Sequence, residues 1–282
     1  MSESFYLYRW ALMAAVVTAP ALALLGAQIL ARGWTTRALI VSQGSSTGLI
    51  LGLSALSFAG VTSSLATFSG ALATAVLFST SVGTLLFLID QKETRQAAVG
   101  DPRSTAILFS IYAALLSLSS IITAYSPHLE INMTSSFVGD LSTTTDLESR
   151  LSLVGGLAIA GWIWLKWNGL TRDAFTQTIL GAPISKHRAW SFAFLATVTI
   201  SVAMQSMGLL FVIGSLFIPA SLLDRRRSNL RRFKIEVAIV AALGALLGFS
   251  LSLQIGSLPT APAIIVSQIV CALASRHLKP AT

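Results

Sequence analysis

Long apolar runs separated by short polar stretches recur along the whole 282-residue chain. A helix needs about 20 residues to cross a hydrocarbon core about 30 Å thick. Runs near that length lie at residues 10–31, 39–59, 64–89, 105–125, 151–167, 189–205, 208–223, 235–255 and 262–275. The pattern predicts an all-α integral membrane protein, a polytopic bundle of about nine transmembrane helices.

The composition supports one membrane domain and no soluble domain. Hydrophobic residues make up 54% of the chain, charged residues make up 11%, and the mean hydropathy is +0.76. Since apolar runs leave no room for a separate globular unit, we expect a single transmembrane domain over residues 1–282. Glu3 precedes the first run and no basic segment does, which favours a retained span over a cleaved signal peptide.

Lysine and arginine positions indicate how the chain threads the membrane. Of the 19 Lys and Arg residues, 17 fall in alternate connections, at 32–38, 90–104, 166–188, 224–234 and after 275. Because basic loops stay cytoplasmic, the pattern predicts the N-terminus outside and the C-terminus inside. The net charge of +8 then follows from topology and needs no nucleic-acid partner. Between Arg188 and Arg225 only a short helical hairpin fits, turning near residues 205–208.

The spans lack the charged groups that many transport mechanisms use. Only Glu236 of the eleven acidic residues touches a span, and all three histidines lie in connections. Ion-driven carriers usually need an ionisable or coordinating group at membrane depth, so a secondary carrier is disfavoured. No lysine follows a glycine, which excludes a phosphate-binding Gly-Lys-Ser/Thr motif. We expect no catalysis by this chain, and energy for uphill transport would come from a separate subunit.

The connection KWNGLTRDAFTQTILGAPISKHR, at 166–188, contains a second kind of helix. Asn168 or Thr171 can cap a short amphipathic helix, which Gly181 and Pro183 would end. Two interpretations stay open. The helix lies in the lipid interface, or it is a cytoplasmic coupling helix that docks on a soluble ATPase.

The order of these features resembles the permease subunit of ATP-binding-cassette (ABC) importers for zinc, manganese and iron. Four stretches carry the resemblance: LARGWTTRALIVSQG (30–44), SFVGDL (136–141), GLLFVIGSLFIPASLL (208–223) and SLPTAPAIIV (257–266). In the last stretch Ala261 replaces the family's glycine. The likeness covers nearly the whole chain.

The resemblance implies an importer permease in a bacterial cytoplasmic membrane, for a divalent transition metal. The implied partners are a cytoplasmic ABC ATPase, an extracytoplasmic solute-binding protein and a second permease, identical or paralogous. The chain would bind no cofactor, and ATP would be used by the ATPase. Contacts with the ATPase are expected from the coupling helix, at Arg172, Asp173, Phe175, Gln177, Leu180 and Gly181.

The second helix departs from the family pattern at the expected metal ligands. Gln43 stands at the family's Asp position and Thr47 at its His position. Amide and hydroxyl oxygens are weak, neutral ligands compared with carboxylate or imidazole, so we predict no tight metal site. The predicted substrate pathway contains Gln43, Ser46, Thr47, Asp140 and Pro219.

The same stretch, SQGSSTG at 42–48, allows two interpretations. Gly44, Gly48 and Gly52 form a small-residue stripe against which another helix can pack closely. Gln43, Ser46 and Thr47 share an adjacent face that could line a hydrated passage.

Three alternatives also stay open for the whole chain: one half of a heterodimer whose partner supplies the ligands, a permease for a chelated or non-metal substrate, and a non-transporting subunit descended from such a permease.

Overall fold

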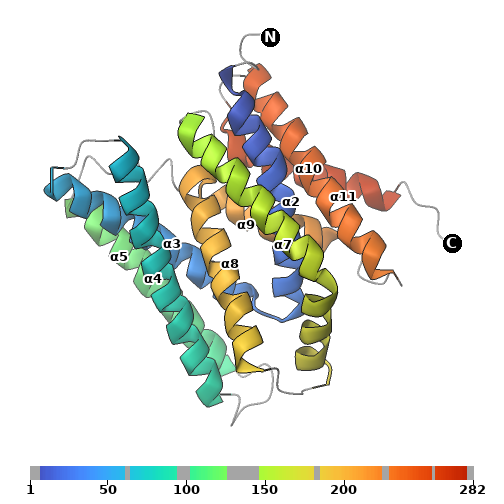
Figure 1. The fold of residues 1–282 in the computed structure, drawn as a ribbon, viewed down its shortest axis with the longest axis horizontal. Helices are drawn as coiled ribbons and strands as arrows, with labels where there is room; N and C mark the ends of the chain where they lie inside the picture. Colours follow the sequence, from blue (N-terminus) through green and yellow to red (C-terminus); the bar gives the residue numbers. More distant parts are fainter. Residues whose placement is uncertain are drawn as a thin grey trace. The chain divides into compact units, whose positions relative to one another are not determined.

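The computed structural model describes residues 7–60, 64–93, 102–125, 146–180, 185–223, 229–255 and 258–277. Within these ranges the ordered secondary structure is helical (Figure 1). The helices are α2 (Arg9–Ala31), α3 (Thr35–Phe58), α4 (Ser64–Glu93), α5 (Pro102–Tyr125), α7 (Asp146–Thr178), α8 (Lys186–Met207), α9 (Leu209–Leu222), α10 (Leu230–Ile255) and α11 (Thr260–His277).

Six of these helices are long and apolar enough to cross a membrane: α2, α3, α4, α5, α8 and α10. Helix α9 and the segment Thr260–Ser275 of α11 are shorter apolar helices. Each predicted run coincides with one helix, which confirms the all-α membrane architecture. The turn expected at 205–208 is also present. Helix α8 ends at Met207, and Gly208 has φ 81°, a left-handed conformation that glycine adopts without a Cβ clash.

Helix α7 differs from the sequence-based expectation. We expected a span at 151–167 and a separate coupling helix at 172–183, but one continuous helix of 33 residues runs from Asp146 to Thr178. Asn168 and Thr171, the expected caps of the second helix, lie inside α7. The helix also passes through Gly169, since one glycine costs a helix interior only about 1 kcal/mol relative to alanine. The predicted coupling segment is therefore the C-terminal part of α7.

The chain divides into two compact units. Unit 1 comprises Met1–Gly33, Phe137–Ile184 and Ser206–Thr282 and contains α2, α7, α9, α10 and α11. Helix α2 is central, because it packs against α7, α9 and α10 (Figure 1). Half of its buried residues are alanines. Small side chains allow close approach. A Cβ on Gly26 would overlap the main-chain carbonyl of Leu216 in α9.

Unit 2 comprises Trp34–Ser136 and Ser185–Gln205, with α3, α4, α5 and most of α8. Helix α3 packs against both α4 and α5 (Figure 1). Helices α4 and α8 meet through two fully buried serines, since Ser79 Oγ lies 2.7 Å from Ser201 Oγ. Near the start of α8 the Trp34 and Phe192 rings pack with their centroids 5.8 Å apart.

The glycine stripe of α3 packs closely against another helix, as one of the two interpretations of SQGSSTG predicted. A Cβ on Gly48 would lie 2.9 Å from Ala75 Cα and 2.9 Å from the Thr74 carbonyl oxygen. The backbones of α3 and α4 are therefore in direct contact at this glycine. Gly52 is equally close to Thr74 and Ala71. In unit 1, Gly244 and Gly248 of α10 meet α11 in the same way, at Gln268 and Ile264.

Candidate functional site

The candidate site in unit 2 is the polar face of α3. Gln43, Ser46 and Thr47 have no solvent-exposed surface. Thr47 Oγ1 lies 2.8 Å from Ser119 Oγ of α5, and it also donates to the carbonyl of Gln43 at 2.9 Å. Gln43 Nε2 donates to the same serine over 3.4 Å, a long hydrogen bond. The glycine face of α3 therefore packs on α4, while this polar face packs on α5.

Ser119 was not predicted from the sequence. It lies within the apolar run of α5, where a serine usually bonds back to its own helix. Ser119 Oγ does donate to the Leu115 carbonyl at 3.0 Å, and Thr47 Oγ1 lies 3.3 Å from the same carbonyl. The only sequence signal is the group of three serines, at 117, 119 and 120, in an otherwise apolar span.

Among the residues that the structure describes, several polar atoms on this part of α3 find no hydrogen-bond partner. They are Gln43 Oε1, Ser45 Oγ and Ser46 Oγ, all buried. A buried polar atom without a partner costs about 1–3 kcal/mol, so such atoms concentrate where a solute or water can bind. Chemically, the face offers one amide oxygen and several hydroxyls. It can exchange hydrogen bonds with a polar or hydrated solute, and it carries no charge.

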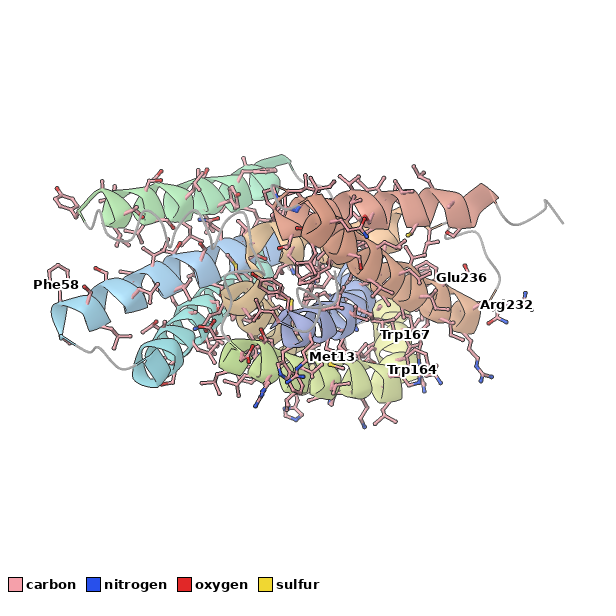
Figure 2. The ribbon with its side chains drawn as sticks, turned by 90° about the horizontal axis from the view of Figure 1, so that it is seen from above. Met13, Phe58, Trp164, Trp167, Arg232 and Glu236 are labelled. Carbon is pink, nitrogen blue, oxygen red and sulfur yellow. The ribbon has the colours of Figure 1, made fainter. Side chains whose placement is uncertain are left out.

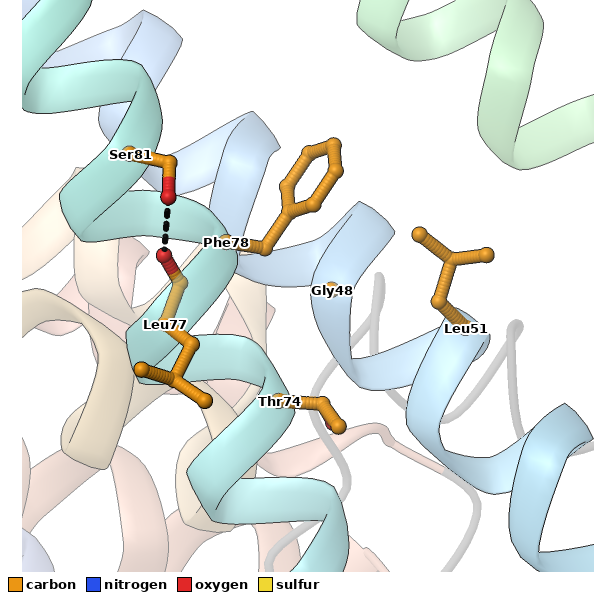
Figure 3. A pocket seen from close by; sticks show the side chains of 6 residues that line it. All are labelled: Gly48, Leu51, Thr74, Leu77, Phe78 and Ser81. Carbon is orange, nitrogen blue, oxygen red and sulfur yellow. Dashed lines mark hydrogen bonds between the residues drawn. The ribbon is translucent and has the colours of Figure 1, made fainter.

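A groove opens beside the polar face, between α3 and α4 of the same unit. It encloses about 290 Å³ and is lined by Gly48, Leu51, Thr74, Leu77, Phe78 and Ser81 (Figure 3). Ser81 Oγ donates to the Leu77 carbonyl at 2.8 Å, and Thr74 Oγ1 to the Ala71 carbonyl at 2.9 Å. Since its hydroxyls bond their own helix, the groove presents a mainly apolar wall and does not suit a polar solute.

Pro219 lies in unit 1, buried in α9. As predicted for a late proline, it cannot donate to the carbonyl four residues earlier, that of Ser215. At that turn Ser215 Oγ accepts a hydrogen bond from Gln268 Nε2 of α11 at 3.0 Å. Both residues are fully buried, and Gln268 Oε1 has no hydrogen-bond partner in the described part of the chain. Sequence reasoning missed Gln268, although it is the one amide in the last apolar run.

The predicted coupling residues lie at the C-terminal end of α7, in unit 1. Arg172 and Phe175 are exposed, Asp173 and Gln177 are half-buried, and Leu180 follows the helix end, 63% exposed. Phe175 is 51% exposed and Ile179 68% exposed. Ala174, next to Phe175 in the chain, is buried, at 2% exposure. Asp140 and Gly181 lie outside the described residues.

The charged end of unit 1 also contains an aromatic cluster. Lys234 Nζ lies 3.5 Å from the centre of the Trp164 ring and donates to the Trp164 carbonyl at 3.1 Å. The centre of the Trp167 ring lies 5.8 Å from Lys234 Nζ. Figure 2 shows the two tryptophans of α7 beside the end of α10 that carries Arg232 and Glu236. Indole rings and a lysine at a helix end are typical of a membrane interface.

Known proteins identify the class of molecule. The model of the ABC 3 transport family matches residues 4–279. The chain belongs to the ABC 3 transport family. It is a multi-pass membrane permease of an ABC transport system. No curated protein matches the sequence significantly.

Two solved structures share the fold of this ABC 3 chain. PsaBC from Streptococcus pneumoniae, in complex with Fab, aligns with a TM-score of 0.71 and 18% identity, over 96% of this chain and 91% of that one. An inward-facing structure described as a metal-chelate type ABC transporter aligns with a TM-score of 0.67 and 19% identity, over 95% and 84%. At such identities the likeness shows the fold.

Proposed function

We propose that this chain is the permease of an ABC importer for a divalent transition metal, zinc, manganese or iron. The observation that carries the proposal is the family match over residues 4–279. The order of motifs along the chain and the metal-chelate type of one similar structure support it. We place the protein in a bacterial cytoplasmic membrane with its N-terminus outside, following the basic connections.

The end of α7 is the proposed docking surface for the ATPase. Phe175, Ile179 and Leu180 expose apolar side chains next to Arg172, at the end of a helix in which Leu170 and Ala174 are buried. Exposed apolar groups rimmed by charge are typical of protein interfaces. ATP binds to the partner ATPase, whose closure would move this segment and change the side to which a chamber between two permeases opens. An extracytoplasmic binding protein would deliver the substrate.

The proposed substrate pathway includes Gln43, Ser46, Thr47 and Pro219, with Asp140 at the outer mouth. The oxygens of the α3 face are neutral, and the described residues contain no group of three His, Cys, Asp or Glu side chains that could hold an ion. The permease would therefore pass a hydrated ion without binding it tightly. In a heterodimer, the second permease could supply stronger ligands.

A chelated metal is a second candidate substrate, favoured by the same residues. Gln43 Oε1, Ser45 Oγ and Ser46 Oγ have no hydrogen-bond partner among the described residues. These oxygens suit hydrogen bonds to a polar organic ligand better than direct coordination of an ion. Gln43 and Thr47 replace both ionisable residues of the family pattern, and this replacement favours the second candidate.

Affinity purification in mild detergent, followed by mass spectrometry, tests the ATPase partnership. We expect a stoichiometric ABC ATPase with the wild-type chain and its loss with Phe175→Ser plus Leu180→Ser. Leu165→Ser is the matched control, because Leu165 is 83% exposed on the same helix outside the docking surface. Absence of any ATPase, under conditions that preserve a known ABC complex, would refute the permease role.

Stimulation of ATP hydrolysis then identifies the substrate class. The reconstituted complex, with its binding protein, would be given Zn²⁺, Mn²⁺ or Fe²⁺, either free or chelated. Stimulation by a free ion supports the first candidate, and stimulation by the chelate alone supports the second. If none of these solutes stimulates hydrolysis above the basal rate, both metal proposals are wrong.

A further inference from the structure

A hydrogen-bonded cluster joins the C-terminal ends of α2 and α7 within unit 1. Its centre is Arg32, directly after α2, which is only 8% exposed. Arg32 Nη2 donates to the Leu170 carbonyl of α7 at 2.8 Å. Its Nη1 donates to the carbonyl of Gln28 at 3.0 Å and to Gln28 Oε1 at 3.1 Å. The guanidinium group therefore links the last turn of α2 to α7 by charge-assisted hydrogen bonds.

Two further hydrogen bonds extend this cluster along α7. Gln28, 2% exposed, donates through Nε2 to Thr171 Oγ1 at 3.0 Å. Thr178 Oγ1 donates to the carbonyl of Ala31 at 3.0 Å. Helix α7 is thus held at Leu170 and Thr171 and again two turns later at Thr178. Thr171 and Thr178 lie four residues before and three residues after Phe175, on the same side of the helix. The hydrogen bonds to α2 therefore flank Phe175, whose side chain is 51% exposed and open to a partner.

The burial of Arg32 is costly and needs a reason. Burial lowers the pKa of Arg32 to about 10, and the nearby Asp173 carboxylate opposes that change. The group remains cationic at neutral pH. A buried charge seldom adds stability over an apolar side chain of similar size, and its best-attested value is fixing one arrangement of elements. Here the arrangement fixed is the orientation of the α7 end on α2.

We propose that Arg32 and Gln28 are positioning residues that make the end of α7 and the end of α2 move as one body. A displacement applied at Phe175 then passes through Leu170, Thr171 and Thr178 to α2, which packs against α7, α9 and α10. This role rests on the proposed docking of the ATPase at the end of α7. Neither residue needs to touch the ATPase or the substrate.

Hydrogen exchange on the purified chain tests the mechanical part without any partner. In Arg32→Met the amides of 168–178 should exchange about tenfold faster, while those of α11 stay unchanged. Arg32→Lys, which keeps the charge but makes fewer bonds, should be intermediate. The matched control is Arg188→Met, which removes an exposed arginine bonded to Ser185. Unchanged exchange at 168–178 in Arg32→Met would overturn the proposal, and so would exchange raised equally in every helix.

The assembled complex tests the coupling part. When ATP and vanadate are added to the wild type, exchange should change in both 168–178 and 24–32. In Arg32→Met the ATPase should still co-purify and 168–178 should still respond, while the response at 24–32 falls at least about fivefold. The double variant Thr171→Val with Thr178→Val keeps the buried arginine and should reduce the exchange response at 24–32 about twofold. This variant provides the test if Arg32→Met does not fold.

The outcomes separate this proposal from the proposed function. If no ATPase co-purifies with the wild type, the docking proposal fails, and the exchange of the isolated chain still decides whether Arg32 fastens α7 to α2. If the ATPase binds and the 24–32 response survives in both Arg32→Met and the double threonine variant, the function stands and the positioning role is wrong.

Discussion

Thr47 of α3 and Ser119 of α5 face each other with their hydroxyl oxygens 2.8 Å apart, both without solvent-exposed surface. Together with Gln43, this pair is the polar part of a helix whose other face is a glycine stripe packed on α4. One short polar stretch in an apolar run thus serves two contacts. Each contact predicts a different mutational effect.

Thr47→Val keeps the shape of the side chain and removes the hydroxyl that bonds Ser119. Hydrogen bonds between membrane helices contribute about 1 kcal/mol or less. We therefore expect a folded protein whose free energy of unfolding falls by about 1 kcal/mol, measured by thermal unfolding in detergent. Thr80→Val is the control, since Thr80 Oγ1 bonds only the Leu77 carbonyl of its own helix among the interactions described. Equal losses in the two variants would show that the contact between α3 and α5 adds nothing.

Gly48→Leu should have a far larger effect than any change of the polar face. Even a Cβ at this position would lie 2.7 Å from Phe78 Cβ and 2.9 Å from two backbone atoms of α4. Because backbone cannot move aside as a side chain can, we expect loss of the folded protein by size-exclusion chromatography. Gly161→Leu is the control, because no atom lies within 4 Å of its added Cβ.

Transport measurements on the same variants separate packing from a pathway. If the α3 face lines the passage, Gln43→Ala and Thr47→Val should lower uptake by the reconstituted complex about tenfold while folding is kept, which corresponds to about 1.4 kcal/mol. If uptake is unchanged in both variants and Gly48→Leu is unfolded, helix packing would be the only remaining role for SQGSSTG. Protein recovery from the membrane should be measured in parallel.

The sequence predicted the helices well because apolar run length decides them. It did not predict that α7 is continuous, because Asn168 and Gly169 look like a helix start, and the residues that meet this segment, Arg32 and Gln28 of the α2 end, are distant in the sequence. Gly48 indicated a close helix contact without saying that the partner is α4. Ser119 was missed because a serine in a membrane helix usually bonds its own backbone, and Gln268 was missed because one amide in an apolar run carries no periodic signal.

The Lys234 and Trp164 pair should contribute measurably to stability through the contact that it makes between α7 and α10. The ammonium group lies 3.5 Å from the ring centre, and partly buried cation–π pairs are worth about 1–2 kcal/mol. A double-mutant cycle with Trp164→Leu and Lys234→Met should therefore give a coupling energy of about 1 kcal/mol. Lys166→Met, exposed on the same helix, should change the unfolding midpoint little. A coupling energy near zero would show that the two side chains are merely neighbours.

Gln268 and Ser215 offer a test of how this membrane protein tolerates buried amides. Ser215→Ala removes the only described acceptor of Gln268 Nε2, and since Gln268 Oε1 already lacks a partner, the whole amide would be left unsatisfied. We expect a loss of about 1–3 kcal/mol from the free energy of unfolding. In Gln268→Met with Ser215→Ala both polar partners are gone, so stability should return to within about 1 kcal/mol of the wild type, measured by thermal unfolding. If the double variant is no more stable than Ser215→Ala, the glutamine has a role beyond this hydrogen bond. Uptake measurements on Gln268→Met would then show whether that role is in transport.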